Sequence, residues 1–186
     1  MAFNINEIRA KLALGGARPN LFRVRLTLPS GVGGDVSDAE FLIQASALPA
    51  STISAIEIPY VGRRVKIAGD REFENWSISV MNDENFKIRH AMEQWHNRIN
   101  SLSGNVNTIG ANPSAYKSDI MYVDQYSKAG GNPGGNIIRS YQFFGVFPLS
   151  IGEIELNWEP SATIETFPVT FSYDWYQISG GPGIVQ

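Results

Sequence analysis

The chain has 186 residues, of which 43% are hydrophobic, and it carries a formal net charge of −3 at pH 7. A chain of this length supports a single domain with a sizeable core. It contains no cysteine, so disulfides and thiolate metal sites are excluded. The slight excess of acid argues against a protein that coats nucleic acid through a basic surface.

The charges are unevenly distributed along the chain. All 15 basic residues fall within residues 1–139, whereas residues 140–186 contain five acidic residues and no lysine or arginine. The five acidic residues are Glu153, Glu155, Glu159, Glu165 and Asp174. A stretch of this kind is most often a solvated face, and we keep that interpretation beside any functional one.

Residues 1–16 are predicted to form an N-terminal arm. A short amphipathic helix is expected over residues 4–14, with apolar side chains at helical spacing. These side chains are Ile5, Ile8 and Leu12. The arm can bury little area by itself, so we expect it to dock elsewhere or to move freely. It lacks the apolar core of a secretion signal, and no run approaches the ~18 apolar residues of a membrane span, so we expect assembly in a cytoplasm and no membrane-spanning segment.

Alternation of apolar and polar residues predicts a series of half-buried strands. They are expected over residues 21–28, 41–48, 53–58, 73–81, 120–126, 137–147, 154–158 and 165–175. The last of these has the longest alternation. Its apolar side chains share one face and are Phe167, Val169, Phe171, Tyr173 and Trp175. In the strand before it, Leu156 and Trp158 are expected to point inward.

Residues 84–101 give the one convincing helix. Asn82 or Asp83 is expected to cap its first turn, because a side-chain oxygen there can accept from the free backbone amides. One continuous apolar stripe is formed by Ile88, Met92, Trp95 and Ile99. The pattern predicts that this face packs against the strands.

One-sided alternation is typical of antiparallel sheets with one packed face and one wet face. We therefore expect a single domain over residues 1–186 that is mainly β, an antiparallel β-sandwich or barrel with one flanking α-helix. Residues 177–186 are glycine-rich and are expected to form a flexible C-terminal tail.

No group of residues predicts catalysis. His90 and His96 are six residues apart on the predicted helix, which is not the spacing of a zinc-binding helix. Ser150 resembles a nucleophile elbow, but strands flank it where a helix is required. Glu153 and Glu155 project from one predicted strand face beside Asn157 and Glu159, so a solvated face is favoured over the carboxylate pair of a glycoside hydrolase. We expect no enzyme, no metal and no cofactor.

Several stretches together resemble the tail tube proteins of contractile-tailed bacteriophages. The most specific stretch is residues 63–83, which contains Ala68-Gly-Asp-Arg-Glu-Phe and ends in Val80-Met-Asn-Asp. Further matches are Ala17-Arg-Pro-Asn-Leu-Phe, Ala47-Leu-Pro-Ala-Ser, Pro113-Ser-Ala-Tyr-Lys, Gly145-Val-Phe-Pro, Gly152-Glu-Ile-Glu-Leu-Asn-Trp and Ile164-Glu-Thr-Phe-Pro-Val-Thr. The chain departs from the family by insertions at residues 30–38 and 130–136, which are expected in loops.

The resemblance implies a structural protein of the virion tail. Members of this family form stacked hexameric rings whose sheets join into an inner β-barrel, similar to the tubes of secretion systems, and this conduit serves DNA ejection when a sheath contracts. The implied partners are further copies of the chain, the sheath, baseplate and tail-terminator proteins, the tape measure protein and, transiently, DNA. A tube of a tailocin or secretion-type injection system is the alternative. A ligand-binding β-sandwich is a more remote one.

Two groups of residues are predicted to act in the assembled tube. In the family a long loop near residues 59–72 takes part in ring stacking. The matching charged residues here are Arg63, Arg64, Lys66, Asp70 and Arg71. A conduit must not hold DNA, because each cation that meets a phosphate adds attraction. Glu153 and Glu155 are therefore candidates for the lumen wall.

Overall fold

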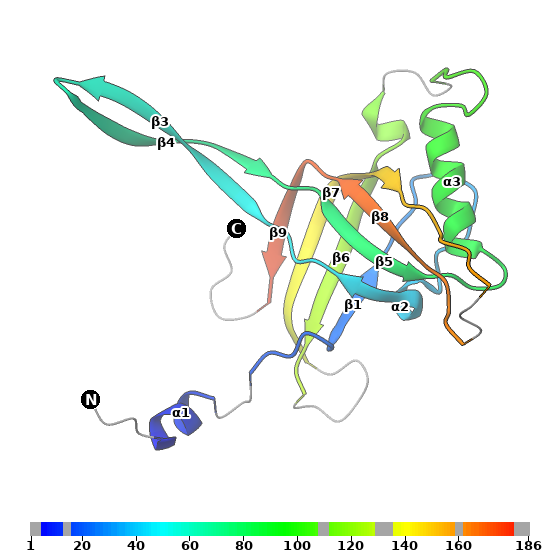
Figure 1. Ribbon diagram of the computed structural model, residues 1–186, viewed down its shortest axis with the longest axis horizontal. Helices are drawn as coiled ribbons and strands as arrows, with labels where there is room; N and C mark the ends of the chain where they lie inside the picture. Colours follow the sequence, from blue (N-terminus) through cyan, green and yellow to red (C-terminus); the bar gives the residue numbers. More distant parts are fainter. Residues whose placement is uncertain (1–4, 13–15, 108–111, 129–135, 159–161, 181–186) are drawn as a thin grey trace.

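The computed structural model describes residues 5–12, 16–107, 112–128, 136–158 and 162–180. Its strands are β1 (Phe22–Arg25), β2 (Ile43–Ser46), β3 (Ser51–Tyr60), β4 (Arg63–Phe73), β5 (Trp76–Met81), β6 (Ser118–Tyr126), β7 (Ile137–Ile151), β8 (Thr166–Ser172) and β9 (Trp175–Ser179). Its helices are α1 (Ile5–Lys11), α2 (Ala39–Leu42), α3 (Lys87–Ile99) and the short 3-10 helix η1 (Pro113–Ala115). Figure 1 shows a body of packed strands flanked by α3, with the β3–β4 hairpin and α1 extending away from it.

The body is a seven-stranded antiparallel sheet that folds over on itself. The strand order is β1-β6-β7-β8-β5-β2, and β9 pairs with β7 beside this path. Strand β7 joins the two halves: its first part pairs with β6 and β9, and its last residues pair with β8. Gly145 lies between these parts at φ 65, where an added Cβ would clash with the carboxylate of Asp174. The predicted fold class, mainly β with one flanking α-helix, is confirmed.

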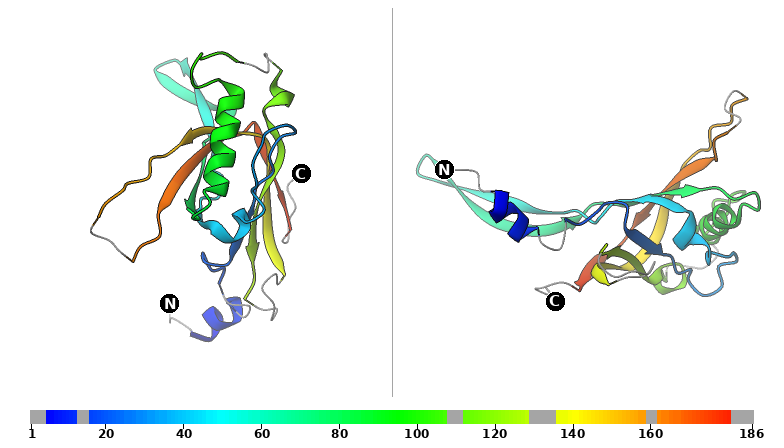
Figure 2. Two further views of the ribbon diagram at one scale, coloured as in Figure 1. Left: turned by 90° about the vertical axis from the view of Figure 1, so that its right-hand side faces the viewer. Right: turned by 90° about the horizontal axis from the view of Figure 1, so that it is seen from below.

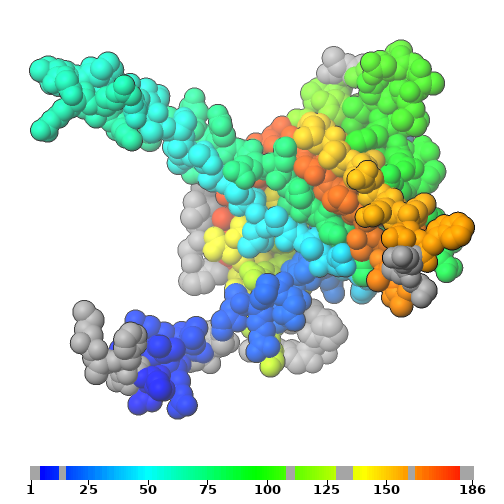
Figure 3. Space-filling model, viewed as in Figure 1, coloured from blue at the N-terminus to red at the C-terminus, as the bar shows by residue number. Residues whose placement is uncertain are grey.

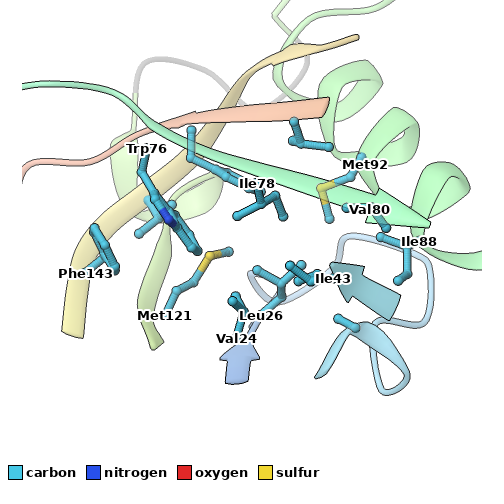
Figure 4. Packing of buried hydrophobic residues seen from close by; sticks show 14 of the residues in the cluster. Val24, Leu26, Ile43, Trp76, Ile78, Val80, Ile88, Met92, Met121 and Phe143 are labelled. Carbon is cyan, nitrogen blue, oxygen red and sulfur yellow. The ribbon is translucent and has the colours of Figure 1, made fainter. Parts of the chain in front are cut away.

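The core lies between the two halves of the folded sheet and is closed by α3 (Figure 4). The ring of Trp76 stacks on Phe143 with centroids 4.5 Å apart and on Phe171 at 5.2 Å. The predicted helix stripe is confirmed, because Ile88, Met92 and Trp95 are buried. Burial of these large apolar side chains is the main term that stabilises the fold.

The helix is shorter than predicted and begins differently. It starts at Lys87, and its N-cap is Phe86, a residue at φ 53 that makes no side-chain capping bond. Asp83 is therefore not the cap residue, yet its Oδ1 accepts the backbone amide of Lys87 at 3.0 Å. The Asp83 carboxylate thus still satisfies one free backbone amide of the first turn. It bonds the amide four residues along the chain, whereas a capping residue normally bonds the amide two or three residues along.

Two predicted strands have other structures. Residues 41–48 contain the end of α2 followed by β2, so Phe41 is helical and exposed. The single strand predicted over residues 165–175 is two strands, because the chain turns at Asp174, whose amide donates to the carbonyl of Phe144 at 2.9 Å. Trp175 is therefore not in the core; it stacks on Phe144 at 4.0 Å outside it.

The strand predicted over residues 154–158 is absent. The preceding strand β7 runs on to Ile151, and the chain then leaves the sheet as an irregular segment. Leu156 and Trp158, which were expected inside, are 77% and 103% exposed. The apolar and polar residues do alternate in this stretch, but in the described structure these two side chains belong to no strand and pack in no core.

Strand β9 ends at Ser179, so three residues of the predicted C-terminal tail belong to the sheet. Other expectations lie outside the described residues: the start of the arm, the predicted end of its helix at residue 14, the insertion after residue 129, Glu159 and the tail beyond Gly180. None of the helices in the described ranges is both long and apolar enough to cross a membrane.

Candidate subunit-interaction site

The basic segment predicted as a loop over residues 59–72 is one arm of a long hairpin. Strands β3 and β4 pair antiparallel from Ser51 opposite Phe73 to Tyr60 opposite Arg63. The turn between them is Val61-Gly62, with both residues at positive φ, as a two-residue hairpin turn of the right twist requires. The hairpin projects from the body in Figures 1 and 3.

The hairpin has one apolar face that no described element covers. Ile56 lies opposite Ile67, and Ile58 lies opposite Val65, so these four side chains share one face. Their exposed fractions are 55%, 50%, 46% and 51% respectively. Both strands pack on each other and, apart from marginal contacts, on no other element. Contiguous exposed apolar surface of this kind marks an interaction site.

The predicted charged residues are divided between the two faces. Arg63 extends from the same face as the apolar side chains, at the tip, whereas Arg64 and Lys66 alternate onto the opposite face. Arg64 Nη1 donates a hydrogen bond to the Glu57 carboxylate at 2.8 Å, and Lys66 Nζ forms an ion pair with the same carboxylate at 3.5 Å. These are surface pairs, so each adds little to the stability of the hairpin.

The remaining predicted residues lie nearer the base of the hairpin. Asp70 falls in a bulge, where its carbonyl accepts Ser54 Oγ at 3.4 Å, and Arg71 lies opposite Ile53. Within the described parts of the chain, neither Arg63 nor Arg71 forms an ion pair. The hairpin therefore presents two arginines whose charges no nearby carboxylate neutralises.

The apolar face was missed by sequence reasoning. Its four members are spaced symmetrically about Val61-Gly62, and a two-residue loop flanked by alternating apolar residues is a hairpin signal. The prediction of a strand over residues 53–58 and a separate basic loop over residues 59–72 concealed that symmetry. A two-stranded ribbon is only marginally stable alone, so these residues require a partner.

The segment between β7 and β8 is the second exposed feature. Figure 2 shows it extending from the end of the body that is remote from the hairpin. Its start is held by Arg89 of α3, whose Nη1 donates to the carbonyl of Gly152 at 2.6 Å. Its end is held by Asn82, which bonds the backbone and side chain of Glu165. The body therefore holds both ends of the segment, while Leu156 and Trp158 between them are exposed.

Glu153 and Glu155 lie in this segment, and both side chains are exposed. The strand that was to present them to a lumen is not formed, so their place at the lumen wall stays a prediction. The two predicted groups of residues lie far apart within one chain, and the structure brings them together neither in space nor on one face.

Helix α1 is the third uncovered feature. Ile5, Ile8 and Leu12 are 67%, 55% and 55% exposed, and the helix has no buried residue. The amphipathic helix predicted in the arm is present, but its apolar stripe has no partner within the described chain.

Comparison with known proteins gives these features their context. A model of the family described as "Phage tail tube protein" matches residues 17–179. The chain belongs to the phage tail tube protein family. It is 33% identical over 161 residues to tail tube protein gp19 of Enterobacteria phage T4. The aligned region covers 87% of this chain and 91% of gp19. The tail tube protein of Serratia phage KSP90 is 25% identical over 173 residues, with 91% and 93% covered.

Solved structures support the same fold for this tail tube protein. A chain of the sheath–tube complex of the extracellular contractile injection system PVC matches with a TM-score of 0.62 at 13% identity, covering 96% of this chain and 99% of that one. A chain of the cap of the anti-feeding prophage matches with a TM-score of 0.60 at 18% identity, covering 89% and 92%. The resemblance predicted from the sequence is confirmed: the chain is a structural component of the virion tail.

Proposed function

We propose that this tail tube protein forms stacked hexameric rings, the inner tube of a contractile tail through which DNA passes during ejection. The hairpin β3–β4 carries the proposal, because its apolar face is stable only when another subunit covers it. A contact between two different surfaces of identical chains closes into a ring when the rotation allows it, and repeats along an axis when it does not.

The free sheet edges support ring closure. Within the described residues, β9 pairs only with β7, and β1 pairs only with β6. Each therefore presents unpaired backbone groups along one side, which natural proteins seldom leave uncovered. Pairing of such edges between neighbouring subunits would join their sheets into the inner barrel expected of the family.

The proposed partners follow from the same assembly. The solved neighbours include chains from a sheath–tube complex, a baseplate and a tube-terminating cap. We assign to this tube protein the corresponding contacts with a sheath, a baseplate and a terminator, with a tape measure protein and then DNA in the lumen. Ring stacking is assigned to Arg63, Arg64, Lys66, Asp70 and Arg71 of the hairpin.

Electron microscopy of the purified, untagged protein tests the proposal. Rings or hollow fibres are expected, whereas particles that stay monomeric at high concentration would refute it. The double substitution Arg63→Glu and Arg64→Glu should leave the circular dichroism spectrum unchanged and shorten or abolish the fibres. The matched control, Arg63→Lys with Arg64→Lys, keeps both charges and should still assemble.

A tube that carries no DNA is the second candidate, and the likeness to contractile injection systems favours it. Particles isolated from cells that produce this protein distinguish the two. Tails joined to DNA-filled heads identify a phage, and headless tails alone identify a tailocin or injection system.

A further inference from the structure

The segment between β7 and β8 encloses a hollow that the fold itself does not fill. Its volume is about 870 Å³, and it lies between residues 152–158 and residues 163–168. Leu156, Trp158 and Ile164 line it and are 77%, 103% and 68% exposed. A tryptophan in this position is a large apolar anchor that tends to be buried at interfaces.

The charged side chains that line the hollow are all carboxylates. Glu153 and Glu155 line it, and residues 152–166 contain no lysine or arginine. Neither carboxylate forms an ion pair within the described residues. The outer half of the hairpin, residues 58–69, has the opposite composition, with three basic residues and no acidic one. Arg64 and Lys66 share the carboxylate of Glu57, whereas Arg63 at the tip forms no ion pair within the described residues. An unpaired arginine on one uncovered apolar surface and unpaired carboxylates on the other are complementary features of an interface.

The two surfaces cannot meet within one chain. The hairpin and the β7–β8 segment extend from opposite ends of the body in Figure 1 and in the right-hand view of Figure 2. A hairpin that leaves one end of a subunit can reach the segment at the other end of the next subunit in the same orientation. Such a head-to-tail contact repeats without limit, as a tube requires.

We infer that the hollow between β7 and β8 receives the hairpin β3–β4 of a second copy of this chain in the neighbouring ring. Leu156 and Trp158 would cover the apolar hairpin face that includes Ile58 and Val65. Glu153 and Glu155 would pair with Arg63, which extends from that same face at the hairpin tip. The inference rests on the proposed stacking of rings and adds the surface that accepts the hairpin. It replaces the lumen wall as the position predicted for Glu153 and Glu155.

Introduced cysteines test the contact directly, because the chain has none of its own. The double variant Arg63→Cys with Glu155→Cys should give a ladder of disulfide-linked chains when tubes are oxidised. Arg63→Cys with Gln94→Cys, which places the second thiol on the exposed side of α3, should give no ladder. Tubes that form normally but yield no ladder from the first pair would overturn the inference.

Charge exchange gives a second test that does not depend on thiols. Glu153→Lys with Glu155→Lys should abolish fibres longer than a single ring, as should Arg63→Glu with Arg64→Glu. The quadruple variant, in which the charges are exchanged, should recover fibres. Failure of the exchanged chain to assemble, while both double variants still fold, would contradict the pairing.

A density map of the wild-type tube separates the possible outcomes. Hairpin density in the hollow supports the inference. Carboxylates of Glu153 and Glu155 on the lumen wall, or against the sheath, would overturn it and leave the proposed tube intact. Absence of any ring or tube would instead remove the proposed function itself.

Discussion

Trp95 shows how one side chain fixes the helix on the sheet. Its ring is fully buried, and its Nε1 donates to the carbonyl of Tyr116 at 2.6 Å. Trp95→Ala should therefore lower the free energy of unfolding by roughly 3–5 kcal/mol, since truncation leaves a cavity and an unpaired carbonyl. Gln94→Ala, at the exposed neighbouring position, should change it by less than about 0.5 kcal/mol. Denaturant unfolding of non-assembled protein measures both, and equal effects would show that the stripe is not the packed face.

Tyr173 gives the protein a sensitivity to alkaline pH. Burial raises the pKa of Tyr173 to about 12, and its hydroxyl has no hydrogen-bond partner among the described residues. The folded state therefore holds the phenol proton more tightly than the unfolded state, whose pKa is about 10. The resulting stabilisation is complete below about pH 10 and is lost as the pH rises through about 12.

Tyr173→Phe removes this proton, so its unfolding midpoint in urea should fall less than that of the wild type between about pH 10 and about pH 12. At neutral pH the variant should be at least as stable as the wild type, because no hydrogen bond is lost. Parallel pH profiles for the two proteins would show that the buried hydroxyl does not titrate in this range.

Single residues also show where sequence prediction succeeds and where it stops. Met92 and Trp95 follow the period of their helix and are buried as predicted. Trp158 follows strand period equally well and is fully exposed. The sequence pattern reports only that a side chain is apolar at a given spacing. It does not report whether the covering atoms belong to the same chain or to another one.

At the scale of elements, the hairpin should be dispensable for folding and essential for assembly. Ile53 lies opposite Arg71 in the ladder, so residues 54–70 can be replaced by a two-residue Asn-Gly turn without disturbing the base. The unfolding temperature of the shortened chain should lie within about 4 °C of the wild type, corresponding to about 1 kcal/mol. Fibres should be absent under the electron microscope. If the shortened chain no longer unfolded cooperatively, the hairpin would be part of the folded core.

Helices and strands could be predicted from the sequence where their apolar faces pack against other parts of the same chain. The helix, β5, β6 and most of β7 occur close to their predicted positions, because their apolar faces meet within the subunit. The separation of β8 and β9 was not predictable, because the alternation continues through Asp174 and only the tertiary bond to Phe144 marks the turn. The candidate stacking residues were found by family resemblance, whereas their division between two hairpin faces needed the register.

At the scale of the whole molecule, the separation of charge predicts that assembly weakens with salt. The basic hairpin and the acidic β7–β8 segment are exposed, so screening acts on both. The Debye length falls from about 10 Å at 0.1 M to about 3 Å at 1 M salt. Fibre length, measured by light scattering and microscopy, should therefore decrease as sodium chloride is raised over this range.

A control separates this effect from general instability. Arg63→Gln with Arg64→Gln removes two positive charges, so any fibres that it forms should be shorter and less sensitive to salt than those of the wild type. Wild-type fibres of unchanged length at about 1 M salt would show that apolar contacts alone hold the rings together.

Strand β7 has a mechanical consequence. It is a single run of 15 residues whose first part belongs to one half of the sheet and whose last part belongs to the other. A load that enters either half therefore reaches the other along covalent backbone through Gly145 as well as across the packed core. Force directed along β7 must shear its ladders with β6, β8 and β9 together instead of peeling them apart in turn. The two halves of the folded sheet should thus resist such a force as one unit.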